Sequence, residues 1–289
     1  MNDRQRKVLA IHDISCMGKC SLTVAIPIIS ATGLEVPVLP TAVLSTQTSG
    51  FEGYSFRDLT DDMVLTLEHW KSLGVTFDGI YTGFLGSDRQ IDIVCRIIDE
   101  LAPEAKVFID PVMGDDGKLY DIFGEDFPDK MKKLVSRADF ISPNITEAML
   151  LLGKEYPTGP LSRRFVESTL RELSALGPRK VILTGVYFDR YNLGAASYDA
   201  DTDEISYYFS KRIPGTYYGT GDIFCSTTVA GIMNGLPMAK ALSVAVDFTQ
   251  RSIERTYAAR TDVRYGVNFE EGIPKMLDDM SLGHLSYKI

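Results

Sequence analysis

Residues 79–110 read GIYTGFLGSDRQIDIVCRIIDELAPEAKVFID. The segment opens with a short apolar run, Gly79–Thr82, of a length typical of a buried strand. An amphipathic stretch with helical spacing follows at Arg89–Leu101, and a second apolar run follows at Val107–Ile109. A strand, a helix and a strand in this order predict a parallel βαβ unit. Asp110 comes directly after the second strand.

The same alternation continues on both sides of this segment. Further strands are predicted at Val8–Ile11, Val36–Leu39, Phe140–Ser142 and Val181–Thr184, with helices at Leu22–Thr32, Leu59–Leu73, Phe127–Val135, Thr146–Leu152 and Leu161–Leu176. After Thr184 we expect two antiparallel strands, Leu193–Tyr198 and Ile205–Phe209, and helices at Asp222–Asn234, Met238–Tyr257 and Phe269–Asp279. We therefore predict one α/β domain over residues 1–289, a three-layer α/β/α sandwich with a mostly parallel central sheet.

The overall composition excludes several classes of protein. The chain has 289 residues, of which 45% are hydrophobic and 24% are charged, so disordered and low-complexity classes are excluded. No apolar run approaches the roughly 18 residues that span a bilayer. The N-terminal residues lack the apolar core and cleavage site of a signal peptide, and we expect a cytoplasmic protein without membrane partners.

The net charge and the numbers of cysteines and histidines exclude further kinds of partner and metal site. A net charge of -9 disfavours nucleic acid as a partner, because a phosphate backbone would be repelled. The four cysteines form no CxxC pair, and there are only three histidines, so a zinc ribbon or a multi-histidine metal site is not expected.

Polar side chains follow four of the predicted strands. They are His12 and Asp13 after the first strand, then Asp110, Asn144 and Thr184. In open parallel sheets ligands bind beyond the carboxyl ends of the strands. We therefore expect these side chains to lie along one binding edge of the sheet.

The sharpest local signal is Gly219-Thr220-Gly221-Asp222, which precedes an apolar helix. Glycines allow close backbone approach, and the N–H groups at a helix amino end suit an anion or a transition-state oxyanion. Asp222 at that end can accept the proton of an attacking hydroxyl. A glycine turn capped by Asp explains the tetrapeptide equally well. The run matches neither GxGxxG nor a Walker A loop.

Two further motifs carry acidic or amide side chains. In DPVMGD, Asp110 to Asp115, the proline holds a strand-end carboxylate at the sheet edge, although a capped turn is the more common reading. Asn144 and Glu147, three residues apart, offer two oxygen ligands that suit Mg²⁺ directly or through water. The same pair also fits a capping box. Taken together with the glycine-rich turn, these are the parts that phosphoryl transfer requires.

The combined motifs resemble the ribokinase superfamily and, within it, the pyridoxal/pyridoxamine kinase branch of vitamin B6 salvage. The resemblance extends from VLAIHDIS through TAVLSTQT, TGFLGS, DPVMGD, SPNITE and VILTG to GTGDIF, and so covers nearly the whole chain. GTGD is specific to the superfamily, and the other motifs point to the B6 branch. The resemblance implies a ribokinase-like fold, ATP-dependent phosphorylation of a B6 vitamer at its 5′-hydroxymethyl group, Mg²⁺, a monovalent cation such as K⁺, and a homodimer.

The resemblance also implies a role for each matching residue. Asp222 would be the catalytic base, and Gly219, Thr220 and Gly221 would form the anion hole. Asn144 and Glu147 would position Mg²⁺, with Asp110 and Asp115 nearby. The expected contacts to ATP are Ser142, Asn144, Thr184 and Thr220. The pyridine pocket would be lined by Asp13, Ala42, Leu44, Thr48 and Phe84.

The chain departs from the family pattern at three pocket positions. Asp13 stands where the family usually has Ser, Ser45–Thr48 replaces SNHT, and Phe84 replaces a tyrosine. Asp13 can pair with a pyridinium or an amine, or serve only as a turn residue, so these departures affect vitamer preference. A hydroxymethylpyrimidine kinase of thiamine synthesis and a non-catalytic vitamer-binding protein remain the alternatives; a sugar kinase is disfavoured because no early lid segment is evident.

Overall fold

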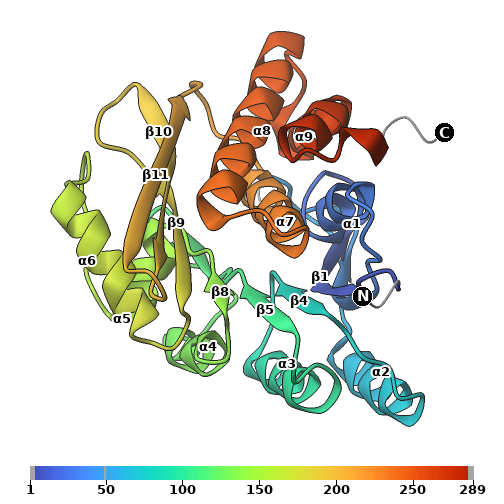
Figure 1. Cartoon of the computed structure of the whole chain (residues 1–289). Coiled ribbons are helices and arrows are strands. Elements are labelled where there is room, and N and C mark those ends of the chain that lie inside the picture. Colours follow the sequence, from blue (N-terminus) through green and yellow to red (C-terminus); the bar gives the residue numbers. More distant parts are fainter. Residues whose placement is uncertain (1–3, 49, 286–289) are drawn as a thin grey trace. The chain divides into compact units, whose positions relative to one another are not determined.

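The computed structural model describes residues 4–48 and 50–285 (Figure 1). These residues divide into two compact units, which are described separately. Unit 1 comprises the described residues of Met1–Leu59 and Arg212–Ile289, and unit 2 comprises Thr60–Lys211. In Figure 1, unit 1 carries the blue and the orange to red parts of the chain, and unit 2 carries its cyan, green and yellow middle.

Unit 1 is built on three adjacent strands and the helices at both ends of the chain. The strands lie in the order β1 (Val8–Ser15), β2 (Val38–Leu44) and β3 (Phe56–Asp58), with β1 and β2 parallel and β2 and β3 antiparallel. The helices are α1 (Leu22–Ala31), α7 (Thr220–Met233), α8 (Met238–Ala259) and α9 (Ile273–Asp279), with 3₁₀ turns η1 (Val263–Tyr265), η2 (Glu270–Gly272) and η3 (Gly283–Leu285). Every residue of α7 from Ile223 to Met233 is buried, because α1 and α8 both pack against it.

Unit 2 contains six strands in the order β11-β10-β9-β8-β5-β4. Strands β4 (Gly79–Thr82), β5 (Lys106–Ile109), β8 (Phe140–Ile141) and β9 (Lys180–Val186) are parallel, whereas β10 (Asn192–Asp199) and β11 (Glu204–Lys211) continue the sheet in antiparallel fashion. Its apolar parallel strands are buried, as expected for strands covered by helices.

Five helices of unit 2 pack side by side in chain order (Figure 1). They are α2 (Thr60–Ser72), α3 (Asp88–Leu101), α4 (Phe127–Val135), α5 (Ile145–Leu152) and α6 (Arg163–Ser174). The short hairpin of β6 (Gly114–Asp115) and β7 (Lys118–Leu119) forms a separate two-stranded sheet. Within residues 4–48 and 50–285, no helix is both long and apolar enough to span a bilayer.

The predicted α/β class with a mostly parallel sheet is confirmed, but three expected strand ends are wrong. The strand expected at Val36–Leu39 is β2, which begins at Val38 and continues to Leu44. β1 continues to Ser15, so His12 and Asp13 lie inside the strand and do not follow it. β9 likewise continues to Val186, so Thr184 is a strand residue. All three strands continue past their apolar runs because backbone pairing with a neighbour extends beyond the run.

The remaining predicted boundaries were within a few residues, and three short strands were not predicted. The helix expected from Asp222 begins at Thr220, and the expected helix Phe269–Asp279 is divided between η2 and α9. The sequence patterns gave no sign of β3 or of the β6–β7 hairpin, whose strands are only two or three residues long. The single domain over residues 1–289 stays a prediction.

Candidate active site

Asp222 is the third residue of α7 and is half-buried. The backbone N–H of Ser21 lies near its carboxylate. Burial raises the pKa of Asp222 to about 7; the Ser21 N–H opposes this rise and the negative charge of Asp13 adds to it. A carboxyl with a pKa near 7 is suited to accept a proton at neutral pH.

The two glycines before Asp222 lie in very different surroundings. Gly219 has a φ of 73°, and a Cβ at this position would collide with the carbonyl oxygen of Lys19. Gly221 is exposed, and a Cβ there would meet no atom within 4 Å. The turn is therefore pressed against the β1–α1 loop at Gly219 and open at Gly221. This leaves room for an anion at the amino end of α7.

Asp13 lies within β1 and is 6% exposed. Its Oδ1 accepts the hydroxyl of Ser21 at 2.6 Å, and its Oδ2 accepts the hydroxyl of Ser15 at 3.1 Å. Burial raises the pKa of Asp13, and the two hydroxyls counteract that rise. Burial also raises the pKa of the neighbouring Cys20 thiol to about 12, so this thiol is protonated at neutral pH.

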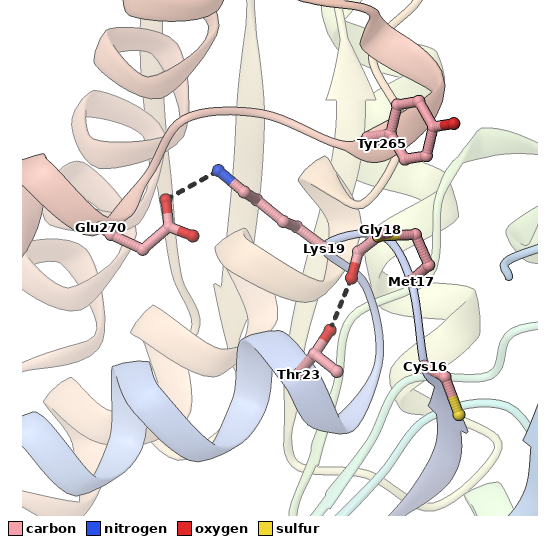
Figure 2. Close-up of a pocket in the computed structure, with 7 residues that line it drawn as sticks. All are labelled: Cys16, Met17, Gly18, Lys19, Thr23, Tyr265 and Glu270. Carbon is pink, nitrogen blue, oxygen red and sulfur yellow. Dashed lines mark hydrogen bonds and ion pairs between the residues drawn. The ribbon is translucent and has the colours of Figure 1, made fainter. Parts of the chain in front are cut away.

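The loop between β1 and α1 is held by the C-terminal part of unit 1. The backbone N–H of Lys19 donates to the carbonyl of Tyr265 at 3.0 Å, and its Nζ lies 2.9 Å from a carboxylate oxygen of Glu270. Figure 2 shows this ion pair beside the hydrogen bond from the Thr23 hydroxyl to the Gly18 carbonyl. These residues line a pocket of about 630 Å³, which contains none of the predicted site residues.

The predicted lining of the pyridine pocket is spread over several environments. Ala42 and Leu44 lie on β2 and are buried, whereas Thr48 is exposed in the following loop. Phe84 belongs to unit 2, where its ring centroid lies 5.8 Å from that of Phe123. Of this predicted set, unit 1 therefore contains Asp13, Ala42, Leu44 and Thr48.

In unit 2, Asn144 and Glu147 form a reciprocal capping box at the start of α5. The Asn144 N–H donates to Glu147 Oε2 at 2.8 Å, and the Glu147 N–H donates to Asn144 Oδ1 at 2.9 Å. The other carboxylate oxygen, Oε1, accepts the N–H of Met113 at 3.3 Å. Burial and the charge of Asp110 raise the pKa of Glu147 well above its usual range.

The other predicted residues of unit 2 lie close to this pair. The N–H of Ser142 donates to the carbonyl of Ile109 at 3.1 Å, and the N–H of Thr184 donates to the carbonyl of Pro143 at 3.0 Å. These bonds connect the carboxyl ends of β5 and β8 to β9, as the sheet-edge argument predicted. Asp115 is exposed in the β6–β7 hairpin, and partial burial of its carboxyl raises its pKa.

The residues of unit 2 fit a magnesium ion held largely through water. In the described part of the chain, no three Asp, Glu, His or Cys side chains are grouped closely enough to hold a metal ion. Both oxygens of Glu147 already accept backbone N–H groups. However, two acidic side chains, Asp110 and Glu147, are buried together, and a nearby cation would relieve their repulsion. Mg²⁺ commonly keeps several waters in such sites.

Sequence reasoning missed the residues that orient these carboxylates. Ser21 contacts both Asp13 and Asp222, and the Met113 N–H and the Gly114 carbonyl hold Glu147 and Asn144. Most of these contacts use backbone atoms, which have no residue-specific signal. Of these residues, only Met113 and Gly114 lie in a motif that the sequence indicated as functional, DPVMGD.

Comparisons with known proteins identify the family of this chain. A family profile described as phosphomethylpyrimidine kinase matches residues 28–266. The structure of a pyridoxal kinase from Lactobacillus plantarum is 30% identical, with a TM-score of 0.87, and covers 95% of this chain and 98% of that chain. A pyridoxine/pyridoxal/pyridoxamine kinase from Bordetella avium is 27% identical over 270 residues, 87% of this chain and 86% of its own length.

A protein from Bacteroides thetaiotaomicron, described as a candidate phosphomethylpyrimidine kinase, is 38% identical with a TM-score of 0.91. The match covers 96% of this chain and 95% of that chain. An orthorhombic crystal form of that protein contains pyridoxal, and its match has a TM-score of 0.87 over 99% of this chain and 97% of that chain. The predicted ribokinase-like fold is confirmed. The chain therefore belongs to the phosphomethylpyrimidine kinase family and, within the ribokinase-like superfamily, to the pyridoxal kinases.

Proposed function

We propose that this chain transfers the γ-phosphoryl group of ATP to the 5′-hydroxymethyl group of a vitamin B6 vitamer, with Asp222 as the base. The observation that carries this assignment is the Asp222 carboxylate at the amino end of α7, with a pKa of about 7, beside the open backbone of Gly221. A carboxyl with a pKa near the working pH is ionised in a large share of the molecules and still binds the transferred proton firmly, so it suits the role of a general base.

In the proposed reaction, the hydroxymethyl oxygen attacks the γ-phosphorus as its proton passes to Asp222. The bond from the γ-phosphorus to the bridging oxygen breaks, and its electron pair leaves with ADP. The N–H groups of Gly219, Thr220 and Gly221 are proposed to stabilise the charge on the transferring group, aided by the dipole of α7. The open space at Gly221 supports this role.

Unit 2 is proposed to hold the phosphates of ATP. Ser142 and Thr184 contribute hydroxyl groups, Thr220 of unit 1 contributes another, and Asn144 contributes its amide. Asp110, Asp115, Asn144 and Glu147 would hold Mg²⁺, chiefly through water, and the ion would neutralise phosphate charge when bound. The repulsion between Asp110 and Glu147 supports a cation at this place.

The substrate is proposed to be a B6 vitamer bound by Asp13, Ala42, Leu44, Thr48 and Phe84. The pyridoxal found in the 38% identical Bacteroides protein supports this choice. The family description favours a second candidate, a hydroxymethylpyrimidine, which is also a flat heteroaromatic alcohol. Specificity constants for pyridoxal, pyridoxamine, pyridoxine and hydroxymethylpyrimidine with Mg-ATP decide between them. A higher constant for the pyrimidine would overturn the proposed substrate.

The proposed base is tested with Asp222→Asn. We expect kcat to fall by roughly 10² to 10⁴ while ATP still binds, because only the proton acceptor is lost. Asp121→Asn, an exposed carboxylate in unit 2, is the matched control and should keep full turnover. Near-normal turnover of Asp222→Asn would remove Asp222 as the base. Binding of a vitamer by the unsubstituted protein without ADP formation would instead identify a non-catalytic binding protein.

Three further properties are proposed by analogy with the family. They are stimulation by a monovalent cation such as K⁺, a homodimer, and a cytoplasmic location. Assays in potassium and in tetramethylammonium salts test the first, and light scattering during size-exclusion chromatography tests the second. Fractionation of the source cells tests the third.

A further inference from the structure

The backbone of Ser21 adopts a conformation that serine rarely takes. Its φ is 51° and its ψ is -130°, in a region that glycine enters freely and that is strained for other residues. Strain of this kind persists only where surrounding contacts hold the residue in place. The neighbouring α1 does not explain it, because the Ser21 side chain makes no capping hydrogen bond to that helix.

The hydroxyl of Ser21 is directed at Asp13. A serine before a helix normally accepts a hydrogen bond from the first turn, but Ser21 donates its proton to Asp13 Oδ1 at 2.6 Å. This is a short, charge-assisted bond between two buried side chains. Ser15 occupies the other oxygen of Asp13, so both oxygens of the carboxylate are fixed.

The β1–α1 loop lies against the amino end of α7, because a Cβ at Gly219 would collide with the Lys19 carbonyl, and the backbone of Ser21 acts on the Asp222 carboxylate and lowers its pKa. Ser21 therefore lies between Asp13, to which its side chain donates a hydrogen bond, and the proposed base. The titratable groups of unit 1 that act on this cluster are Asp13, Cys20 and Asp222 themselves. Cys20 is protonated at neutral pH and brings no charge.

We propose that Asp13 is a positioning residue for the reaction: it holds Ser21 in its left-handed backbone conformation, and Ser21 in turn orients the Asp222 carboxylate. This inference rests on the proposed function, because it assigns Asp222 the role of base. It is separate from the contact of Asp13 with the pyridine ring proposed above. Loss of that contact affects KM, whereas loss of positioning affects kcat and should be reversed when Ser21 is replaced by glycine.

The test compares Asp13→Ala with the double variant Asp13→Ala/Ser21→Gly. Without Asp13, Ser21 relaxes, and we expect kcat to fall by up to about 10²-fold, as misplacement of a reacting group does. Glycine adopts the required φ and ψ without a side-chain anchor. The double variant should therefore recover most of the lost kcat. If it recovers none, the positioning role is wrong, whatever the KM values for the vitamers.

Single variants of serine provide the controls. Ser21→Ala should lose more kcat than Ser21→Gly, because alanine lacks the anchor and still resists a positive φ. Ser15→Ala removes the other hydroxyl from Asp13 but leaves Ser21 held, so its loss should be smaller than that of Ser21→Ala. Ser30→Ala, at the exposed end of α1, should keep full activity. Equal losses in Ser21→Ala and Ser21→Gly would overturn the proposal.

The pH dependence of kcat separates positioning from general damage. Ser21→Ala keeps the backbone N–H but no longer holds it toward Asp222. A contact that lowers the pKa of Asp222 is then weakened, so the acid limb in Ser21→Ala should move to higher pH. In the double variant the N–H is kept and the charge of Asp13 is gone, so the limb should move to lower pH. An unchanged limb in all variants would contradict the inference. Absence of vitamer phosphorylation by the unsubstituted protein would contradict the proposed function instead.

Discussion

Asn144 and Glu147 cap each other at the start of α5, with reciprocal backbone to side-chain hydrogen bonds of 2.9 and 2.8 Å. The pair therefore stabilises the helix whether or not it also serves a metal ion. A capping interaction and a ligand role are not exclusive, because a carboxylate that accepts two N–H groups retains further lone pairs. The two roles can be separated by comparing this cap with another cap of the same kind.

Asn144→Ala should lower the free energy of unfolding by about 1 kcal/mol, the usual cost of removing a helix cap. Ser162→Ala, which removes the cap of α6 at the Phe165 N–H, should cost a similar amount. Urea unfolding measures both. Only Asn144→Ala should also raise the Mg²⁺ concentration required for half-maximal kinase activity. Equal magnesium dependence in the two variants would mean that Asn144 is a cap and nothing more.

Replacement by alanine should lower the stability of the protein at Gly219 but not at Gly221, the two glycines of the GTGD turn. Gly219→Ala adds a Cβ that collides with the Lys19 carbonyl and must also adopt a φ of 73°, so we expect a loss of roughly 2 to 6 kcal/mol in the free energy of unfolding. Gly221→Ala meets no neighbouring atom, so its stability should be nearly unchanged.

Gly221→Ala should nevertheless lower kcat by about 10²-fold, because its methyl group occupies the space proposed for the transferring phosphoryl group. Thermal unfolding and steady-state kinetics on both variants check this pair of predictions. An active Gly221→Ala protein would show that the anion does not bind at the amino end of α7.

The sequence predicted the fold well because its signals are local. Buried parallel strands are recognisable as short apolar runs and surface helices by their spacing of apolar residues. Strand Gly79–Thr82 and helix Phe127–Val135 were predicted with their observed bounds. The ends of β1, β2 and β9 were wrong because pairing with a neighbour extends a strand past its apolar run. No property of the residues themselves indicates that extension.

Only those parts of the candidate site that lie in recognisable sequence motifs were predicted. Asp110, Asn144 and Thr184 were expected at one edge, and their segments are joined there by backbone hydrogen bonds. The role of Ser21 could not be predicted, because it depends on a positive φ and on two contacts from residues 8 and 201 positions away along the chain. Such contacts follow from tertiary packing and carry no sequence motif.

Asp222 should make the protein less stable as the pH rises, because its pKa is raised by folding. A carboxyl with a folded-state pKa of about 7 and an ordinary value of 3.8 binds more protons in the folded state between these two values. Its contribution is therefore fully present below pH 3.8 and is lost as the pH rises through 7. Asp222→Asn cannot ionise, so it should be more stable than the unsubstituted protein at pH 8.

Urea unfolding at pH 5 and pH 8 measures this difference, with the exposed Asp121→Asn as the control. The stability gained by Asp222→Asn should be larger at pH 8 than at pH 5, and the control should show no such change. A gain of equal size at both values would mean that the carboxyl titrates in its ordinary range. A general base with pKa near 7 would then be excluded.

Magnesium alone should stabilise the folded protein through the buried acidic pair of unit 2. A cation near Asp110 and Glu147 offsets their mutual repulsion, and a ligand that binds only the folded state stabilises it by mass action, by about 2.7 kcal/mol at a hundredfold excess over Kd. Thermal unfolding at pH 8 with increasing MgCl₂ should therefore show a rising Tm. Glu147→Gln keeps only one acceptor for the N–H groups of Asn144 and Met113, so its Tm without magnesium should be lower, and the further rise on adding the salt should be reduced. Glu125→Gln, an exposed glutamate, should keep the full magnesium response. An undiminished response in Glu147→Gln would place the stabilising ion elsewhere on the protein.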